Sequence, residues 1–174
     1  LTTYLPAISL VTFSLATPET GDTVTASGTC TFANASVGNN KTVTCSEIAL
    51  SGADAGNYTV VSTATTTANV TAKTVTVTAE DKSMDYGGNA PTYTYTVSGA
   101  IGSETAVSGM ASYTIKSGNT TINNVSTANA GEYDIIPSGL TAESNYTITY
   151  VKGTLTINTI SCEPPTNITI NPDS

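Results

Sequence analysis

Four oxygen-bearing side chains lie close together near the middle of the sequence: Glu80, Asp81, Asp85 and Asn89. Carboxylate and amide oxygens are the ligands that Ca²⁺ prefers in proteins. Their spacing matches neither an EF-hand loop nor an Asp-rich nonapeptide. A solvated linker between two domains is therefore the favoured interpretation, and we expect no cofactor and no metal; calcium is the alternative for which these residues are candidate ligands.

The same carboxylates are the only candidates for acid–base catalysis. The chain has no histidine, so it lacks the commonest general base and any serine–histidine or cysteine–histidine pair. A glycosidase-like use of Glu80, Asp81 and Asp85 would need an aromatic platform or an arginine clamp beside them, and the chain has no arginine. No phosphate-loop signature occurs. We predict a protein that is not an enzyme.

Two of the three cysteines flank a turn-rich stretch, residues 33–40, at nearly equal distances from its centre. An antiparallel pair of strands joined there would place Cys30 opposite Cys45, within reach of a disulfide. Two separate buried thiols are the alternative. Cys162 is then left over as a candidate intermolecular thiol, and without histidine or a C-x-x-C pair no zinc site is expected.

Asparagine occurs in eight Asn-x-Ser/Thr sequons, which are candidate N-glycosylation sites in a secreted protein. Asparagine is also a turn residue and threonine a strand residue, so the sequons have a purely structural explanation as well. The eight positions are Asn34, Asn40, Asn57, Asn69, Asn119, Asn124, Asn145 and Asn167.

The charge and hydropathy patterns exclude two classes of partner. The net charge is −8, and the five lysines are scattered, whereas a protein that binds nucleic acid clusters its cations against phosphates. No run of about 20 apolar residues occurs, so this segment is not expected to insert into a membrane. The composition instead looks like that of a secreted protein, so we expect an extracellular location in an oxidising compartment.

Short segments that alternate threonine with apolar or aromatic residues recur along the chain, as in half-buried strands. Serine and threonine make up about a third of the residues, and no window has the spacing of an amphipathic helix. We predict an all-β protein of two small antiparallel β-sandwich domains, immunoglobulin-like, with a β-grasp-like sheet as the alternative for each. The clearest segments are residues 73–79, 92–97, 113–115, 145–150 and 153–157.

An internal repeat predicts where the domains meet. Residues 54–60 and 129–135 both read alanine–glycine, one residue, tyrosine, then a β-branched residue two positions later. Residues 57–60 also echo 145–148. We interpret the tyrosines as corner residues whose rings are buried and whose hydroxyls bond to the backbone. The predicted domains are 1–72 and 73–160, with 161–174 as a further strand or the start of a following region.

These segments resemble two known domain families. The first half is similar to the YDG domain, and the second half to the MBG domain of the YGX type, of filamentous-haemagglutinin-type bacterial surface proteins. The resemblance implies β-rich repeats of a surface adhesin or stalk without catalysis. It is carried by residues 21–28, 37–44, 48–58 and 68–73 in the first half, and by 86–99, 130–133 and 145–157 in the second.

The two ends of the chain suggest an alternative function. The Tyr-Asp-Gly expected near the start of the first domain is absent, and an extra short strand bracketed by prolines follows the second. Such a strand could complete the sheet of a neighbouring copy and build a pilus-like filament by donor-strand complementation. Candidate donor-strand residues are Ile8, Leu10 and Phe13, or Ile168 and Ile170.

A third hypothesis is a module that binds a glycan or protein through tyrosines. Tyr93 and Tyr95 alternate with threonine and share a face with Val97, although a core face is the more ordinary interpretation. The expected partners are otherwise neighbouring copies or neighbouring domains of the same surface protein. The sequence does not identify a host or matrix ligand, the source organism or the oligomeric state.

Overall fold

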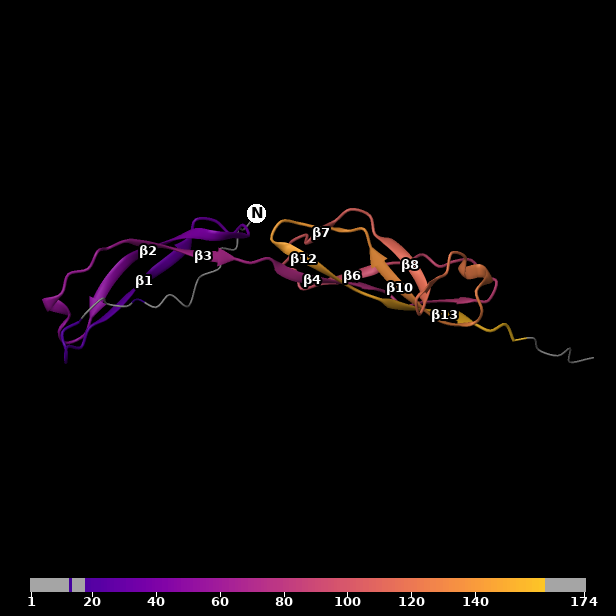
Figure 1. Cartoon of the computed structure of the whole chain (residues 1–174), viewed down its shortest axis with the longest axis horizontal. Helices are drawn as coiled ribbons and strands as arrows, with labels where there is room; N and C mark the ends of the chain where they lie inside the picture. Colours follow the sequence, from indigo (N-terminus) through magenta and orange to yellow (C-terminus); the bar gives the residue numbers. More distant parts are fainter. Residues whose placement is uncertain (1–12, 14–17, 162–174) are drawn as a thin grey trace, which may run out of the picture. The chain divides into compact units, whose positions relative to one another are not determined.

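The computed structural model describes residue 13 and residues 18–161. Its contacts divide the chain into two compact units, with the division between Ala72 and Lys73. The described residues form β-strands and two short 3₁₀ helices, and no α-helix (Figure 1). The prediction of an all-β protein is therefore confirmed.

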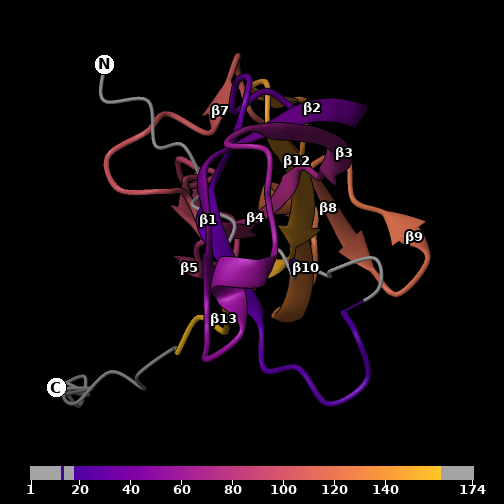
Figure 2. The same ribbon diagram turned by 90° about the vertical axis from the view of Figure 1, so that its left-hand side faces the viewer.

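The first unit contains one antiparallel sheet of three strands in the order β1-β2-β3. The hairpin between the first two strands pairs Phe32 with Val43 and Cys30 with Cys45, and a bulge interrupts the register between Ser27 and Thr29. The elements are β1 (Thr25–Phe32), β2 (Gly38–Ser51), the 3₁₀ helix η1 (Ala55–Asn57) and β3 (Ala64–Val70). Figure 2 shows η1 as a magenta helical turn.

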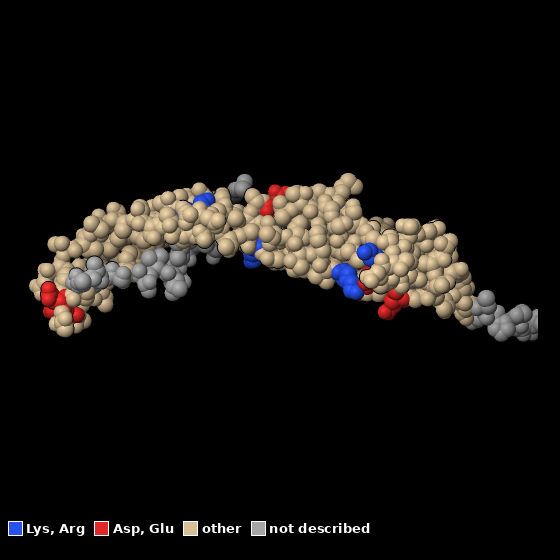
Figure 3. Space-filling view, in the orientation of Figure 1, with Lys and Arg blue, Asp and Glu red and all other residues tan. Residues whose placement is uncertain are grey.

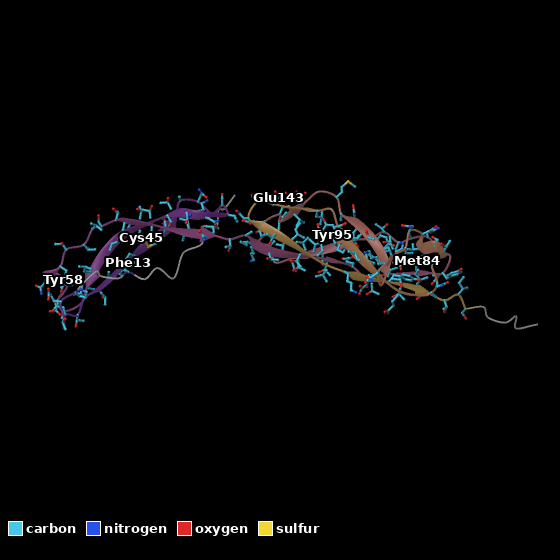
Figure 4. The ribbon with its side chains drawn as sticks, viewed as in Figure 1. Phe13, Cys45, Tyr58, Met84, Tyr95 and Glu143 are labelled. Atoms are coloured by element: carbon cyan, nitrogen blue, oxygen red, sulfur yellow. A yellow bond between two sulfur atoms is a disulfide. The ribbon has the colours of Figure 1, made fainter. Side chains whose placement is uncertain are left out.

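The core of the first unit lies on one face of this sheet. Cys30, Val43, Cys45 and Ile48 are buried there, and the ring of Phe13 packs against them (Figure 4). Alternation explains the pattern, since successive side chains of a strand point to opposite faces: on β2, residues 43 and 45 are buried while 42 and 44 are exposed.

The second unit contains two larger sheets and a two-stranded ribbon. One sheet has the order β5-β13-β10-β8-β9, the other β12-β4-β6, and β11 pairs with β7. The elements are β4 (Lys73–Ala79), β5 (Lys82–Asp85), β6 (Tyr95–Ser98), β7 (Val107–Ser108), β8 (Ser112–Ser117), β9 (Thr120–Thr121), η2 (Val125–Thr127), β10 (Gly131–Ser138), β11 (Thr141–Ala142), β12 (Tyr146–Val151) and β13 (Gly153–Asn158).

The two larger sheets of the second unit pack together as a sandwich. Strand β4 contacts β10 and β13 of the other sheet, and its Ala79 belongs to the same buried cluster as Ile135 and Leu155. A second cluster gathers Val75, Ala106 and Tyr146. Burial of these apolar side chains is the main favourable contribution to folding.

Two strand pairs in this unit are parallel, which the antiparallel prediction did not include. Strand β4 pairs in parallel with β12, and β5 in parallel with β13. The chain therefore passes from one sheet to the other twice, side by side, at residues 80–81 and at 152. Gly153 is required at this crossing, because a Cβ there would lie 2.5 Å from the carbonyl oxygen of Ala79.

The face that Tyr93 shares with Tyr95 and Val97 of β6 is buried only at its Tyr93 end. Tyr93 packs against the larger buried cluster and Tyr95 is half-buried, but Val97 is 39% exposed. The expectation that all three share a core face is wrong for Val97. It lies on edge strand β6, which pairs only with β4 among the described strands.

Candidate functional site

The tyrosine of the first repeat closes a turn that lies far from it in the sequence. The hydroxyl of Tyr58 donates a hydrogen bond to Oδ2 of Asp22 (2.7 Å) and accepts one from the backbone N–H of Glu19 (2.8 Å). The turn is also closed by a bond from the Asp22 N–H to the Glu19 carbonyl (3.1 Å). Figure 4 shows Tyr58 at one end of the first unit.

Tyr146 makes the same set of bonds in the second unit. Its hydroxyl donates to Oε2 of Glu104 (2.5 Å) and accepts from the backbone N–H of Ile101 (3.1 Å). The Glu104 N–H closes the turn by donating to the Ile101 carbonyl (3.0 Å). The side chain of Tyr146 is itself buried against Val75 and Ala106.

We call this arrangement the tyrosine clasp: a tyrosine hydroxyl accepts a hydrogen bond from the backbone N–H of the first residue of a turn and donates one to the side-chain carboxylate of the fourth residue. Among the described residues each unit has one clasp, on the Tyr58 and Tyr146 that the repeated Asn-Tyr-Thr sequence aligns. A hydrogen bond to a carboxylate is stronger than one between neutral groups. Each clasp therefore ties a connecting turn to a tyrosine distant in the sequence, which follows η1 in the first unit and begins β12 in the second.

Both clasp tyrosines have a raised pKa. For Tyr146 the hydrogen bond to the Glu104 carboxylate is the largest cause, and the Ile101 N–H partly offsets it. For Tyr58 the Glu19 N–H, which lowers the pKa, is the largest single influence, but the Asp22 hydrogen bond, burial and nearby carboxylates together raise it. Phenolate beside a carboxylate is unfavourable because like charges repel.

Tyr133, which the alanine–glycine repeat aligns with Tyr58, makes a local corner instead. Its hydroxyl donates to the carbonyl of Asn129, four residues earlier (2.7 Å). The hydroxyl of each repeat tyrosine has the predicted backbone partner, a carbonyl for Tyr133 and an N–H for Tyr58, but both tyrosines are only half-buried. The geometric counterpart of Tyr58 is Tyr146, not Tyr133.

The calcium candidates lie inside the second unit, so the linker interpretation of residues 80–89 is wrong. Glu80 and Asp81 form the crossing between β4 and β5. Asp81 Oδ1 accepts a hydrogen bond from the Thr154 N–H (2.6 Å), which fastens one crossing of the chain to the other. Glu80 Oε2 accepts from Thr94 (2.6 Å) and Lys82 (3.0 Å), and these bonds, Thr94 first, lower the pKa of Glu80.

The other two candidates belong to the turn after β5. Asp85 Oδ1 accepts from the Asn158 side-chain amide (3.1 Å), and Asn89 is exposed. Gly87 has a φ of +78° in this turn, a left-handed conformation that glycine adopts without steric cost. Within the described residues no three acidic, cysteine or histidine side chains gather as a metal site. The three candidate carboxylates thus accept separate hydrogen bonds.

The cysteines of the first hairpin form the predicted disulfide. Cys30 and Cys45 are bonded and face each other across β1 and β2. Both are buried in the core of the unit (Figure 4). The bond therefore joins two strands at the centre of a small sheet. Cys162 lies outside the described residues.

The described sequon asparagines are all exposed, so a modifying enzyme has access to each side chain. Asn69 accepts a hydrogen bond from the Asn40 N–H (2.9 Å), and Asn124 from the Ser126 N–H (3.1 Å) at the start of η2. Asn167 lies outside the described residues. The seven described positions are Asn34, Asn40, Asn57, Asn69, Asn119, Asn124 and Asn145.

Of the candidate donor-strand residues, only Phe13 is described. Its ring packs against the core cluster of the first unit, and a Cβ on Gly28 would lie 3.0 Å from its Cζ atom. Gly28 thus leaves the space that the aromatic ring fills. Ile8, Leu10, Ile168 and Ile170 lie outside the described residues.

Rows of hydroxyl side chains cover one sheet face in each unit. In the first unit Thr44 pairs with Thr31 and Thr65, one on each side. In the second, Thr74 pairs with Thr147, and their hydroxyl oxygens are 3.2 Å apart. Charged side chains form only small, separate groups on the face seen in Figure 3. The paired side chains named on these two sheet faces are polar and uncharged.

A hollow of about 420 Å³ lies in the second unit between the segment before β6, strand β8 and the segment that joins β9 to η2. The rings of Tyr93 and Tyr113 line it, with centroids 5.6 Å apart and planes tilted by 40°. The Tyr93 hydroxyl is buried and makes no hydrogen bond to the described residues. We call this feature the aromatic hollow; Thr121, Ile122, Asn123 and Asn124 also line it.

Sequence reasoning singled out Tyr93 but missed the rest of the aromatic hollow. Tyr113 reaches it from β8, and Asn123 and Asn124 from a segment about 30 residues further along the chain than Tyr93. Periodicity indicates which face of a strand a residue occupies, but not which other strands lie beside it. Burial raises the pKa of both tyrosines, for Tyr113 with a smaller contribution from Tyr95 and Glu80.

The comparisons with known proteins agree with the two-unit architecture. Residues 6–68 match the YDG domain, and residues 75–156 match the MBG domain of the YGX type. No curated protein and no solved structure matches the chain. In the described part of the chain no helix is both long and apolar enough to cross a membrane.

Proposed function

This chain carries a YDG domain followed by an MBG domain of the YGX type, and we propose that the pair is a structural repeat module of an extracellular cell-surface protein. In this proposal the module belongs to an adhesin or its stalk and performs no catalysis. The observation that carries it is the repeated tyrosine clasp: each unit has its own buried cluster and its own clasped turn.

Three further features support a spacer role outside the cell. The Cys30–Cys45 disulfide suits an oxidising compartment. The hydroxyl rows keep two sheet faces soluble without adding charge. Parallel pairing and the bond between the crossings near Asp81 and Gly153 hold the first two strands of the second unit, β4 and β5, to its last two, β12 and β13. A module of this kind bears load along its terminal strands.

Surface labelling of intact source cells tests the location. A membrane-impermeant amine reagent should label Lys152, which is 62% exposed, before the cells are lysed. Mass spectrometry should also recover the peptide pair joined through Cys30 and Cys45. Labelling that requires lysis, together with reduced cysteines, would contradict an extracellular module.

A filament subunit is the second candidate, and the packing of Phe13 favours it. Phe13 is one of the predicted donor-strand residues, and its ring occupies the space beside Gly28 on the open face of a three-stranded sheet. In β-strand addition an extended segment pairs with a sheet edge through backbone hydrogen bonds, and its side chains fill pockets of the core, as the Phe13 ring does here. In the filament the ring would come from a neighbouring copy.

Co-purification of two differently tagged copies tests this candidate. If Phe13 is the donor, Phe13→Ala should prevent the copies from co-purifying, whereas deletion of residues 161–174 should not. The reverse result would assign the donor role to the C-terminal segment. Phe32→Ala is the matched control, because Phe32 packs against the same cluster from β1. Co-purification that survives both Phe13→Ala and the deletion of residues 161–174 would rule out donor-strand exchange.

A further inference from the structure

We propose that the aromatic hollow of the second unit binds a neutral sugar, one pyranose ring of a glycan. The hollow is defined above by Tyr93, Tyr113, Thr121, Ile122, Asn123 and Asn124, and its volume of about 420 Å³ accommodates a small ligand. The proposal is independent of the structural role, because a spacer module functions with or without such a site.

The two tyrosine rings provide the apolar part of the site. Tyr93 and Tyr113 lie at 5.6 Å between centroids with a 40° tilt, so they form an angled aromatic wall. An aromatic face carries negative charge density, which attracts the positively polarised C–H groups on the apolar face of a pyranose. A sugar is the common hydroxylated ligand that has such a face.

The rim provides hydrogen-bonding groups without charge. Asn123 and Asn124 carry amides that both donate and accept, and Thr121 adds a hydroxyl. None of the residues that line the hollow is acidic or basic. Taking an ionised ligand out of water without an opposite charge is unfavourable. The lining therefore selects a neutral ligand over an acidic sugar or a phosphate.

The Tyr93 hydroxyl is a further reason to expect a polar ligand. It is buried, and it has no hydrogen-bond partner among the described residues. Buried hydroxyls in proteins normally have a partner, and an unpaired one is unfavourable. A small movement of the ring would let a ligand hydroxyl supply the missing bond.

The segment that carries the rim is held in place before any ligand arrives. Asn124 accepts a hydrogen bond from the Ser126 N–H at the start of η2, and the neighbouring Val125 is buried in the core. The Ile122 N–H donates to the carbonyl of Ile115 on β8 (2.8 Å). A preorganised rim reduces the entropy lost on binding.

Titration of the full, unglycosylated chain with a panel of neutral hexoses, N-acetylhexosamines and acidic sugars tests the proposal by ¹H–¹⁵N NMR. At least one neutral sugar should shift the amide signals of Tyr113, Asn123 and Asn124 saturably. One sugar ring at ordinary ligand efficiency corresponds to a Kd in the low millimolar range, roughly 1–10 mM. Saturable shifts confined to the first unit, or binding of acidic sugars only, would overturn it.

Two variants separate binding from stability. Asn123→Ala removes an exposed rim amide and should raise the Kd about fivefold, the effect of one lost hydrogen bond. Asn129→Ala is the matched control, since Asn129 is exposed outside the hollow and its contact with Tyr133 uses the backbone carbonyl. Equal affinities for the original chain and for both variants, or no saturable shift with any neutral sugar, would overturn the assignment.

Discussion

The hydroxyl of Tyr146 lies 2.5 Å from Oε2 of Glu104, 42 positions earlier in the chain, and donates a hydrogen bond to it. Tyr58 and Asp22 stand in the same relation in the first unit, at 2.7 Å and 36 positions. In both cases the hydroxyl also accepts from the N–H at the first residue of the turn. The same device therefore stabilises two units that have different numbers of strands.

Loss of the clasp hydroxyl should loosen the turn in the second unit. Tyr146→Phe keeps the buried ring but leaves the Ile101 N–H and the Glu104 carboxylate without their protein partner. We expect the thermal unfolding midpoint of that unit to fall by roughly 5 °C, the size produced by a lost hydrogen bond in a domain this small. Tyr86→Phe, at an exposed tyrosine, is the control and should leave the midpoint unchanged.

Alkaline pH should destabilise the protein through the same tyrosines. Because the pKa of Tyr146 is raised in the folded state, the unfolded chain loses this proton first as the pH rises. The stabilisation is complete below the unfolded pKa of about 10 and is lost as the pH rises through the folded value. Urea unfolding measured from pH 8 to 11 should show this decline, and Tyr146→Phe should make it shallower. Identical slopes would contradict the assignment.

Acid should remove a stabilising contribution of Glu80. Its pKa is lowered by the hydrogen bond from Thr94 and then by Lys82, so the contribution is present above the unfolded pKa of about 4.3 and disappears as the pH falls through the folded value. Glu80→Gln should unfold more easily than the original chain at neutral pH, and the difference should vanish in acid. Glu132→Gln, at an exposed glutamate on β10, should show no such convergence.

Reduction of the disulfide should destabilise the first unit selectively. Cys30 and Cys45 are separated by 15 positions, and closing a loop of that length contributes about 3 kcal/mol by restricting the unfolded chain. Chemical denaturation with and without reductant, in a Cys162→Ser background, isolates this bond from the third cysteine. The unfolding of the second unit should not respond. A shift of both units together would show that they unfold as one.

The crossing of the strands should tolerate no side chain at residue 153. In Gly153→Ala the new Cβ would lie 2.5 Å from the Ala79 carbonyl oxygen and 3.0 Å from that of Glu80. Backbone atoms on both sides must then move, and we expect the second unit to lose roughly 1–3 kcal/mol of stability. Gly56→Ala is the control, because a Cβ added at Gly56 would meet no atom within 4 Å. Equal stability of the two variants would mean that the crossing can widen.

Local patterns were sufficient to predict several contacts. Cys30 and Cys45 could be paired from the sequence because both flank one turn, so their register follows from counting outward along two strands. The buried positions on β4 follow from strict alternation of threonine with Val75 and Val77. The backbone bond of Tyr133 is local, since its partner Asn129 is only four positions away.

Long-range relations required the tertiary structure. The sequence by itself determined an all-β chain of two units, a hairpin disulfide and the repeat that contains both clasp tyrosines, because each depends on near neighbours or on composition. Only the fold decided that β4 runs parallel to β12, that Tyr146 meets Glu104, and that Asp81 bonds to Thr154 instead of forming a linker. A period of two indicates a strand's faces, but it carries no information on which distant strand lies beside it or in which direction that strand runs.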